Sequence, residues 1–212
     1  RKVALGPRPG LPYRLARGEA GGSVAATTAM LDKLMLVKTP AELSAYRRAS
    51  HLADEGYKVF LEGIRIGKPE YQLVAGVEAF YRANGCAENF QILGSGGVDM
   101  RGMHPPGDNR VKAGDLVTTE LTPCVEGYYA QICRTAVVGE PTKAQQRVLE
   151  IYRESLAAGI DVVKPGVRAC DIARAENDVF RKYGLGEYVT SSYTRVRGHG
   201  LGLYTDARPA IL

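Results

Sequence analysis

Hydrophobic residues recur at helical spacing in four stretches of the chain, arranged as two pairs. The pattern predicts helices over approximately these ranges: 39–62, 68–84, 142–163 and 168–183. The first stretch opens on Thr39-Pro40-Ala41-Glu42, and the third opens on Thr142 with Gln145 three residues later. Both are helix-capping patterns, which fixes where these helices are expected to begin.

Between and after the helix pairs, the pattern changes to strands and tight turns. The strands are predicted at 89–93, 115–121, 128–138 and from Tyr188 toward the glycine-rich run 197–202. The turn at Glu126-Gly127 joins the second and third of these strands into a hairpin. Residues 1–30 form a distinct segment, in which 1–22 are rich in Gly, Pro and Arg and 18–28 are predicted to be loop, and 31–37 form a short apolar stretch.

The order of two helices followed by a strand occurs twice. A shift of 99 residues superposes Gly67 on Gly166 and Gly85 on Gly184. This internal repeat predicts two related α/β halves that face each other, with a pocket where their strands meet.

Composition narrows the class of protein. The chain has 212 residues, of which 45% are hydrophobic and 24% charged, as in ordinary globular domains. No apolar run is long enough to cross a membrane, and the first residues lack the apolar core of a signal peptide. The four cysteines are scattered without a CxxC pair, which excludes a zinc knuckle and favours a reducing cytoplasm. The net charge of +5 comes without a basic, aromatic stripe, so we expect no nucleic-acid binding.

With only three histidines, the position of each one is informative. His104 lies in a loop between strands, where it is either a functional residue or a loop histidine bonded to a backbone carbonyl. His199 lies between two glycines at a strand end, where it either faces a ligand or belongs to an incidental turn. His51 is expected to be a helix-surface or packing residue. The run GSGGVDMRG matches no nucleotide-binding loop, and Cys124 and Cys133 are expected to be buried strand residues.

Together, these motifs resemble the pita-bread superfamily, which contains methionine aminopeptidase, Xaa-Pro aminopeptidase, prolidase and creatinase. The resemblance runs from Lys38 to Pro209 and includes the helix entry at 38–42, His104-Pro105, Arg134-Thr135 and the run 198–202. It implies an α+β fold of two pseudo-symmetric halves around a curved antiparallel sheet. It also implies that 1–37 are the tail of an N-terminal domain and linker. Residues 38–212 would then be the catalytic domain without its C-terminal strands, so that the chain is incomplete at both ends.

The expected metal site departs from the family pattern. The positions of the two aspartate ligands hold Glu120 and Gln131, and the histidine ligand position is kept as His199. The two glutamate ligands would follow Leu212, and the family's His-Glu pair falls at Asp206-Ala207. An amide is a poor replacement for a bridging carboxylate. We therefore expect no cofactor and no metal ligands, with a divalent metal possible but disfavoured.

The resemblance implies a creatinase-like hydrolase of a C–N bond in a small amino-acid-like or amidino substrate. His104 would be the general acid/base, with Glu120 and His199 as further catalytic residues. The expected substrate contacts are Tyr129, Gln131 and Arg208. Because Cys133 stands where creatinase has a glutamate, creatine itself is not supported as the substrate.

Two alternatives remain open. One is an Xaa-Pro peptidase with an altered metal site, and the other is a non-catalytic domain that binds peptide or protein. The family's members are commonly homodimers. We therefore expect a cytoplasmic homodimer that acts on a small molecule or short peptide, without nucleic acid or membrane.

Overall fold

The computed structural model describes residues 3–5, 24–26, 28–97, 100, 102–190 and 196–211, and it divides the chain into two compact units, 1–43 and 44–212. In the first unit, β1 (Val3–Leu5) pairs in parallel with β2 (Val24–Ala26), and α2 (Thr28–Leu36) follows. The prediction of loop over residues 18–28 is therefore wrong at β2, and the apolar stretch 31–37 is largely helix. Residues 6–23 lie outside the described part of the chain.

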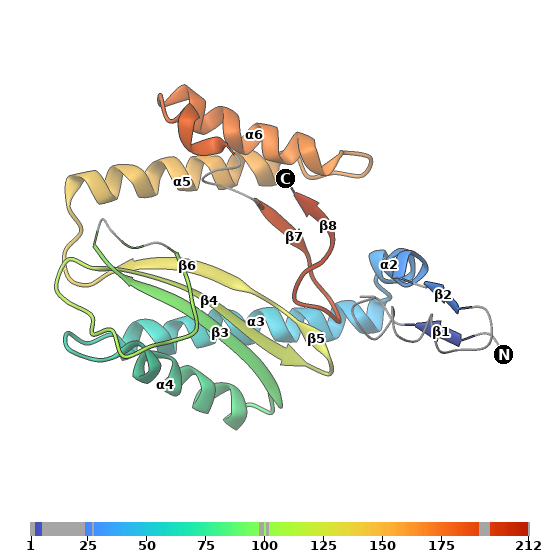
Figure 1. Cartoon of the computed structure of the whole chain (residues 1–212), viewed down its shortest axis with the longest axis horizontal. Coiled ribbons are helices and arrows are strands. Elements are labelled where there is room, and N and C mark those ends of the chain that lie inside the picture. The colour runs from blue at the N-terminus through green and yellow to red at the C-terminus, as the bar shows by residue number, and fades with distance from the viewer. Residues whose placement is uncertain are drawn as a thin grey trace. The chain divides into compact units, whose positions relative to one another are not determined.

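The predicted helix start at Thr39 is confirmed. In α3 (Pro40–Gly63), the backbone N–H of Thr39 donates to Glu42 Oε2 at 2.7 Å, and the N–H of Glu42 donates to Thr39 Oγ1 at 3.3 Å. This reciprocal pair satisfies two amides that have no partner within the helix. The next helix is α4 (Glu70–Ala83). The two helices pack against one face of the sheet (Figure 1).

The sheet has β4 at its centre. β3 (Glu88–Gly96) pairs antiparallel with β4 (Leu116–Val125) on one side, and β5 (Tyr128–Tyr129) and β6 (Ile132–Val137) pair with it on the other. The predicted hairpin turn is confirmed, because Glu126 and Gly127 have φ values of 52° and 84°, as a tight turn with two positive φ angles requires. The predicted strand 128–138 is interrupted, since Ala130 instead donates its N–H to the carbonyl of Pro123.

Burial alternates along β4 and defines two faces of the sheet. Val117, Thr119 and Leu121 are fully buried, and they point to the outer face, which the helices cover. Thr118 and Glu120 alternate with them and are only partly buried. We call the face that carries Thr118 and Glu120 the inner face. The main residues of the helix-covered core are Phe60, Leu73, Val77, Tyr81, Leu93, Val117 and Leu121.

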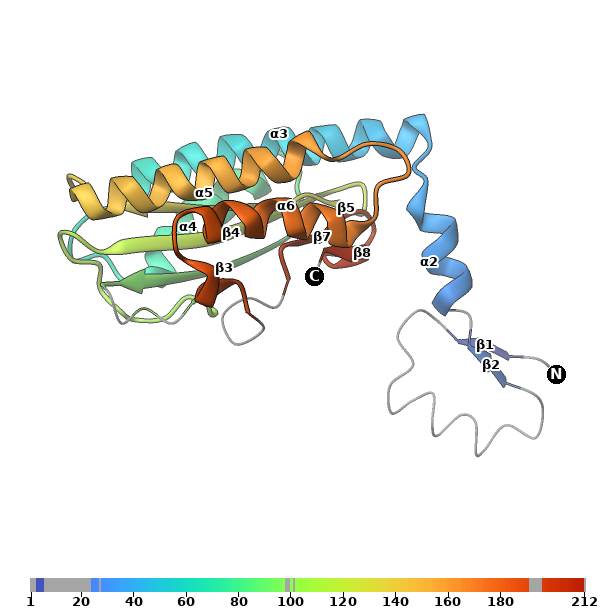
Figure 2. The same ribbon diagram turned by 90° about the horizontal axis from the view of Figure 1, so that it is seen from above.

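The second helix pair forms a smaller core of its own. α5 (Lys143–Asp161) and α6 (Ala169–Lys182) lie side by side (Figure 2) and meet through Ile151, Val179 and Phe180. The capping box predicted at Thr142 and Gln145 is present. After α6 come the 3₁₀-helix η1 (Gly186–Val189) and the antiparallel pair β7 (Gly198–Gly200) and β8 (Ala207–Ile211). The strand predicted to begin at Tyr188 is therefore wrong at its start, and β8 was not predicted.

The internal repeat is confirmed at the level of the backbone. Shifting α4 by 99 residues gives the bounds of α6. The repeated glycines also match, with φ values of 84° at Gly67 and 88° at Gly166, and of 78° at Gly85 and 74° at Gly184. A left-handed glycine before and after the second helix of each half explains why these positions recur in the sequence.

Candidate active site on the inner face of the sheet

Glu120 is the central polar residue of the inner face. Its Oε1 accepts a hydrogen bond of 3.0 Å from the side-chain amide of Gln131, and its direct cross-strand partner on β6 is Cys133. Burial raises the pKa of Glu120, the positive charge of a protonated His199 lowers it, and Asp206 raises it. Partial desolvation also raises the pKa of the Cys133 thiol, as does the nearby Glu120 carboxylate. Glu120 and Gln131 are thus in contact beside Cys133, which is exposed, so the expectation that it is buried is wrong, whereas Cys124 is buried as expected.

His199 approaches this group from β7. Its Nδ1 lies 3.0 Å from the carbonyl oxygen of Gly200, and its Nε2 lies 3.3 Å from Asp206 Oδ1. Because a carbonyl oxygen can only accept, Nδ1 carries the hydrogen in this arrangement. A Cβ on Gly200 would lie 2.2 Å from the carbonyl oxygen of Arg208, so no other residue fits there. Gly200 therefore allows the close backbone packing of β7 against β8 beside His199.

Tyr129 and Arg208, the other predicted substrate contacts, lie on β5 and β8. Burial raises the pKa of the Tyr129 hydroxyl, which bonds to Glu88 and Cys124. The Tyr129 backbone N–H donates to Gly202 at 2.8 Å and ties β5 to the segment before β8. Arg208 is exposed on β8. Neither side chain is shown in contact with Glu120, so their role in substrate contact stays a prediction.

The structure does not bring His104 to this group. His104 and Leu93 exchange two backbone hydrogen bonds of 3.0 Å, so they are directly opposed and their side chains share one face. Leu93 is fully buried on the outer face, whereas its neighbour Ile92 pairs with Glu120 on the inner face. His104 Nδ1 contacts the carbonyl of Pro105 at 2.8 Å and lies 3.8 Å from Glu70 Oε2. The structure therefore does not place His104 together with Glu120 and His199, as had been predicted.

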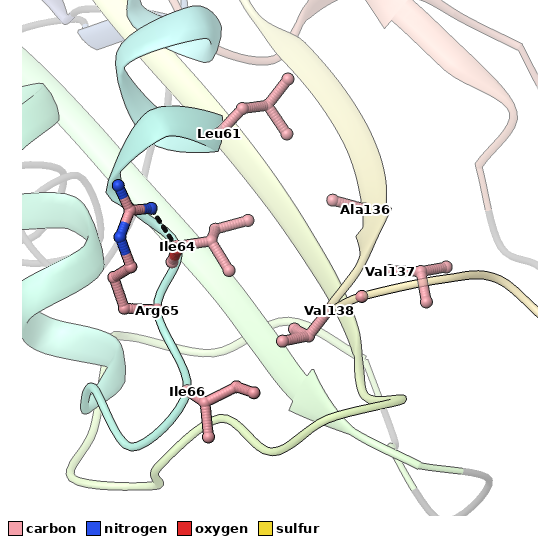
Figure 3. Close-up of a pocket in the computed structure, with 8 residues that line it drawn as sticks. Leu61, Ile64, Arg65, Ile66, Ala136, Val137 and Val138 are labelled. Atoms are coloured by element: carbon pink, nitrogen blue, oxygen red, sulfur yellow. Dashed lines mark hydrogen bonds between the residues drawn. The ribbon is translucent and has the colours of Figure 1, made fainter.

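An apolar hollow of about 510 Å³ lies elsewhere, where the end of α3 meets β6 (Figure 3). Leu61 and Ile64 face Ala136 and Val138 across it, and the Arg65 guanidinium turns back to the carbonyl of Ile64 at 2.6 Å. The residues that line it are Leu61, Ile64, Arg65, Ile66, Ala136, Val137, Val138 and Gly139. None of the predicted site residues is among them.

Metal-binding chemistry is only partly present. Glu120 offers a carboxylate, His199 an imidazole nitrogen and Asp206 a second carboxylate, all of which are divalent-metal ligands. Within the part of the chain that the structure describes, however, no three His, Cys, Asp or Glu side chains are placed so that they could hold a metal ion. Instead, the Gln131 amide contacts Glu120, and Asp206 contacts His199. The described donors therefore do not make up a metal centre.

The fold and its internal repeat together define a pita-bread domain. Residues 44–212 match the model of "Metallopeptidase family M24", and the chain belongs to this family. It is 30% identical over 184 residues to an Xaa-Pro dipeptidase of Pyrococcus furiosus, covering 86% of this chain and 52% of that protein. It is 27% identical over 205 residues to an Xaa-Pro dipeptidase of Lactobacillus helveticus, covering 94% and 55%.

The structural comparison agrees with the sequence comparison. The structure of the prolidase from Pyrococcus furiosus superposes with a TM-score of 0.86 at 27% identity, over 99% of this chain and 62% of that one. The chain spans about half the length of the curated relatives it matches. The predicted pita-bread fold and superfamily are thereby confirmed.

The cofactor prediction is wrong. We expected no cofactor and a disfavoured divalent metal, whereas the chain belongs to a family of metallopeptidases and is similar to Xaa-Pro dipeptidases. An amide at one aspartate position, Gln131, is not a sufficient reason to expect a metal-free protein. In the described ranges, no helix combines the length and apolar character needed to cross a membrane.

Proposed function

We propose that this domain hydrolyses a C–N bond, the peptide bond of a short Xaa-Pro-type substrate, on the inner face around Glu120. The observation that carries the proposal is the convergence of Glu120, Gln131 and His199, two of them in direct contact, in a member of a metallopeptidase family. Similarity to Xaa-Pro dipeptidases over 86% of the chain supports a peptide as the substrate class.

Each side chain has a chemical task in this proposal. The Glu120 carboxylate, oriented by the Gln131 amide, holds and orients the attacking water. The Gly200 carbonyl fixes the His199 ring through Nδ1, and Nε2, when protonated, donates to the substrate carbonyl oxygen in place of the exposed Asp206 carboxylate. His104 has no task here, because its side chain lies on the outer face. Glu120 and His199 would be this chain's ligands to a divalent ion, which would supply an activated water; the described residues do not by themselves complete such a site.

The test is a substrate panel with the purified protein. Samples are treated with a chelator and then assayed with and without added Mn²⁺, Co²⁺ or Zn²⁺, against Xaa-Pro dipeptides, dipeptides without proline, and creatine. We expect release of free proline, at a rate that falls on chelation and returns with the ion. Hydrolysis of creatine alone would favour the creatinase-like alternative, and no turnover in any sample would favour the non-catalytic peptide-binding alternative.

We also propose that the protein is a cytoplasmic homodimer, as the family resemblance suggested. Light scattering coupled to size-exclusion chromatography tests the dimer directly, since a monomer mass at micromolar concentration would contradict it. Localisation of a tagged protein in its host cell tests the compartment.

A further inference from the structure

Glu70, the first residue of α4, is a completely buried carboxylate that the proposed chemistry does not use. Its Oε1 accepts hydrogen bonds from the backbone N–H and the hydroxyl of Ser95, at 3.1 and 2.6 Å. Its Oε2 accepts from the N–H of Gly107 at 3.1 Å. The Asn109 amide donates to the Ser95 hydroxyl at 2.8 Å and completes the cluster. A buried carboxylate is tolerated only with such partners, so Glu70 joins α4, β3 and the segment 102–111.

The backbone of that segment is attached at the same place. The N–H of Glu70 donates to the carbonyl of Asn109 at 3.0 Å, and the N–H of Tyr71 donates to the carbonyl of Gly107 at 3.1 Å. Next along the segment, His104 pairs with Leu93 at the edge of β3. The segment therefore continues the sheet beyond β3, and Glu70 holds it from the outer face.

The same segment also reaches the inner face, at Gly94. Gly94 alternates with Leu93 along β3 and pairs with Thr118, so a Cβ there would point to the inner face. That Cβ would lie 2.1 Å from the carbonyl oxygen of Gly102 and 3.5 Å from Met100 Sδ. Gly102 and Met100 thus cover the inner face near Thr118, which lies two residues from Glu120 on β4. They form a wall beside the candidate site.

We propose that Glu70 is a positioning residue for the candidate site, which it never touches. By binding Ser95 and Gly107 on the outer face, it fixes the segment whose Gly102 and Met100 bound the inner face. The proposal rests on the proposed function for its effect on catalysis. Because a wall displaced by about 1 Å misplaces the substrate, kcat/KM is expected to fall by roughly tenfold or more. The loss is expected mainly in KM, since Glu70 contacts no reacting atom.

The test compares Glu70→Ala and Glu70→Gln with Glu78→Gln, a matched change of an exposed glutamate on the same helix. Glu70→Gln keeps the size but turns an NH₂ group toward an N–H donor. One readout needs no substrate: hydrogen exchange of residues 102–110, resolved by mass spectrometry. For both Glu70 variants we expect exchange in 102–110 to rise roughly tenfold, with α3 unchanged. Glu78→Gln is expected to match the wild type.

Unchanged hydrogen exchange in 102–110 of folded Glu70→Ala would overturn the proposal. So would exchange that rises equally throughout α3, α4 and β3, because Glu70 would then support the whole unit rather than one wall. A protein that hydrolyses nothing but still shows the local response to Glu70→Ala would support the positioning role and overturn only the proposed function.

Discussion

The close approach at Gly94 gives a quantitative test of how the inner face is built. In Gly94→Ala, the new Cβ would lie 2.1 Å from the carbonyl oxygen and 3.0 Å from the carbonyl carbon of Gly102. Carbon and oxygen atoms in contact are normally about 3.3 Å apart, so Gly102 must move by roughly 1 Å. Relieving an overpacked site of this kind costs about 1–3 kcal/mol. We expect the free energy of unfolding in urea to fall by that amount and KM to rise.

Gly76→Ala is the matched control for this change. Gly76 lies within α4, and the nearest atom to its added Cβ would be Val59 Cγ1, at 4.0 Å. With free space and helical backbone, alanine is expected to stabilise the protein by about 0.5–1 kcal/mol. The two substitutions should therefore shift stability in opposite directions. A Gly94→Ala protein as stable as the wild type, with unchanged KM, would refute the reasoning.

Three further predictions concern the site residues. Burial raises the pKa of Glu120, so the folded state binds more protons than the unfolded state, and stability is lost as the pH rises above the ordinary glutamate value of about 4.3. Glu120→Gln should therefore increase the free energy of unfolding more at about pH 7.5 than at about pH 3.5; an equal effect at both would contradict this. His104→Ala should leave kcat within about threefold, since its ring faces Glu70, and a loss of 100-fold or more would restore its acid/base role. Gln131→Asp should raise the affinity for Mn²⁺ in calorimetry, because it adds a carboxylate beside Glu120, and an unchanged affinity would count against a metal role at this position.

The helices and their repeat could be predicted because their signals are local. Each capping pair spans only three positions, Thr39 with Glu42 and Thr142 with Gln145. The repeated glycines mark a backbone conformation that few other residues adopt. The short strand β8 has no comparable signal, since its five residues include a proline and an exposed arginine. Its pairing with β7 is a tertiary contact.

The candidate site was predictable in part. Family spacing led to Glu120, Gln131 and His199, which the structure places near one another. The spacing did not predict on which face of the sheet the His104 side chain lies. Successive residues of a strand point to opposite faces, and only the pairing with Leu93 fixes the register. Glu70 was missed as well, since its partner Ser95 is 25 residues away and an exposed glutamate at a helix start looks the same in sequence.

The most direct test of the central claim is kcat/KM for an Xaa-Pro dipeptide in the Glu120→Gln protein. Glu140→Gln, at an exposed position outside the site, is the matched control. The inner-face site predicts a loss of at least roughly 100-fold in Glu120→Gln, with the fold intact by circular dichroism, and no change in the control. Equal activity in the two variants would contradict the assignment of the chemistry to Glu120.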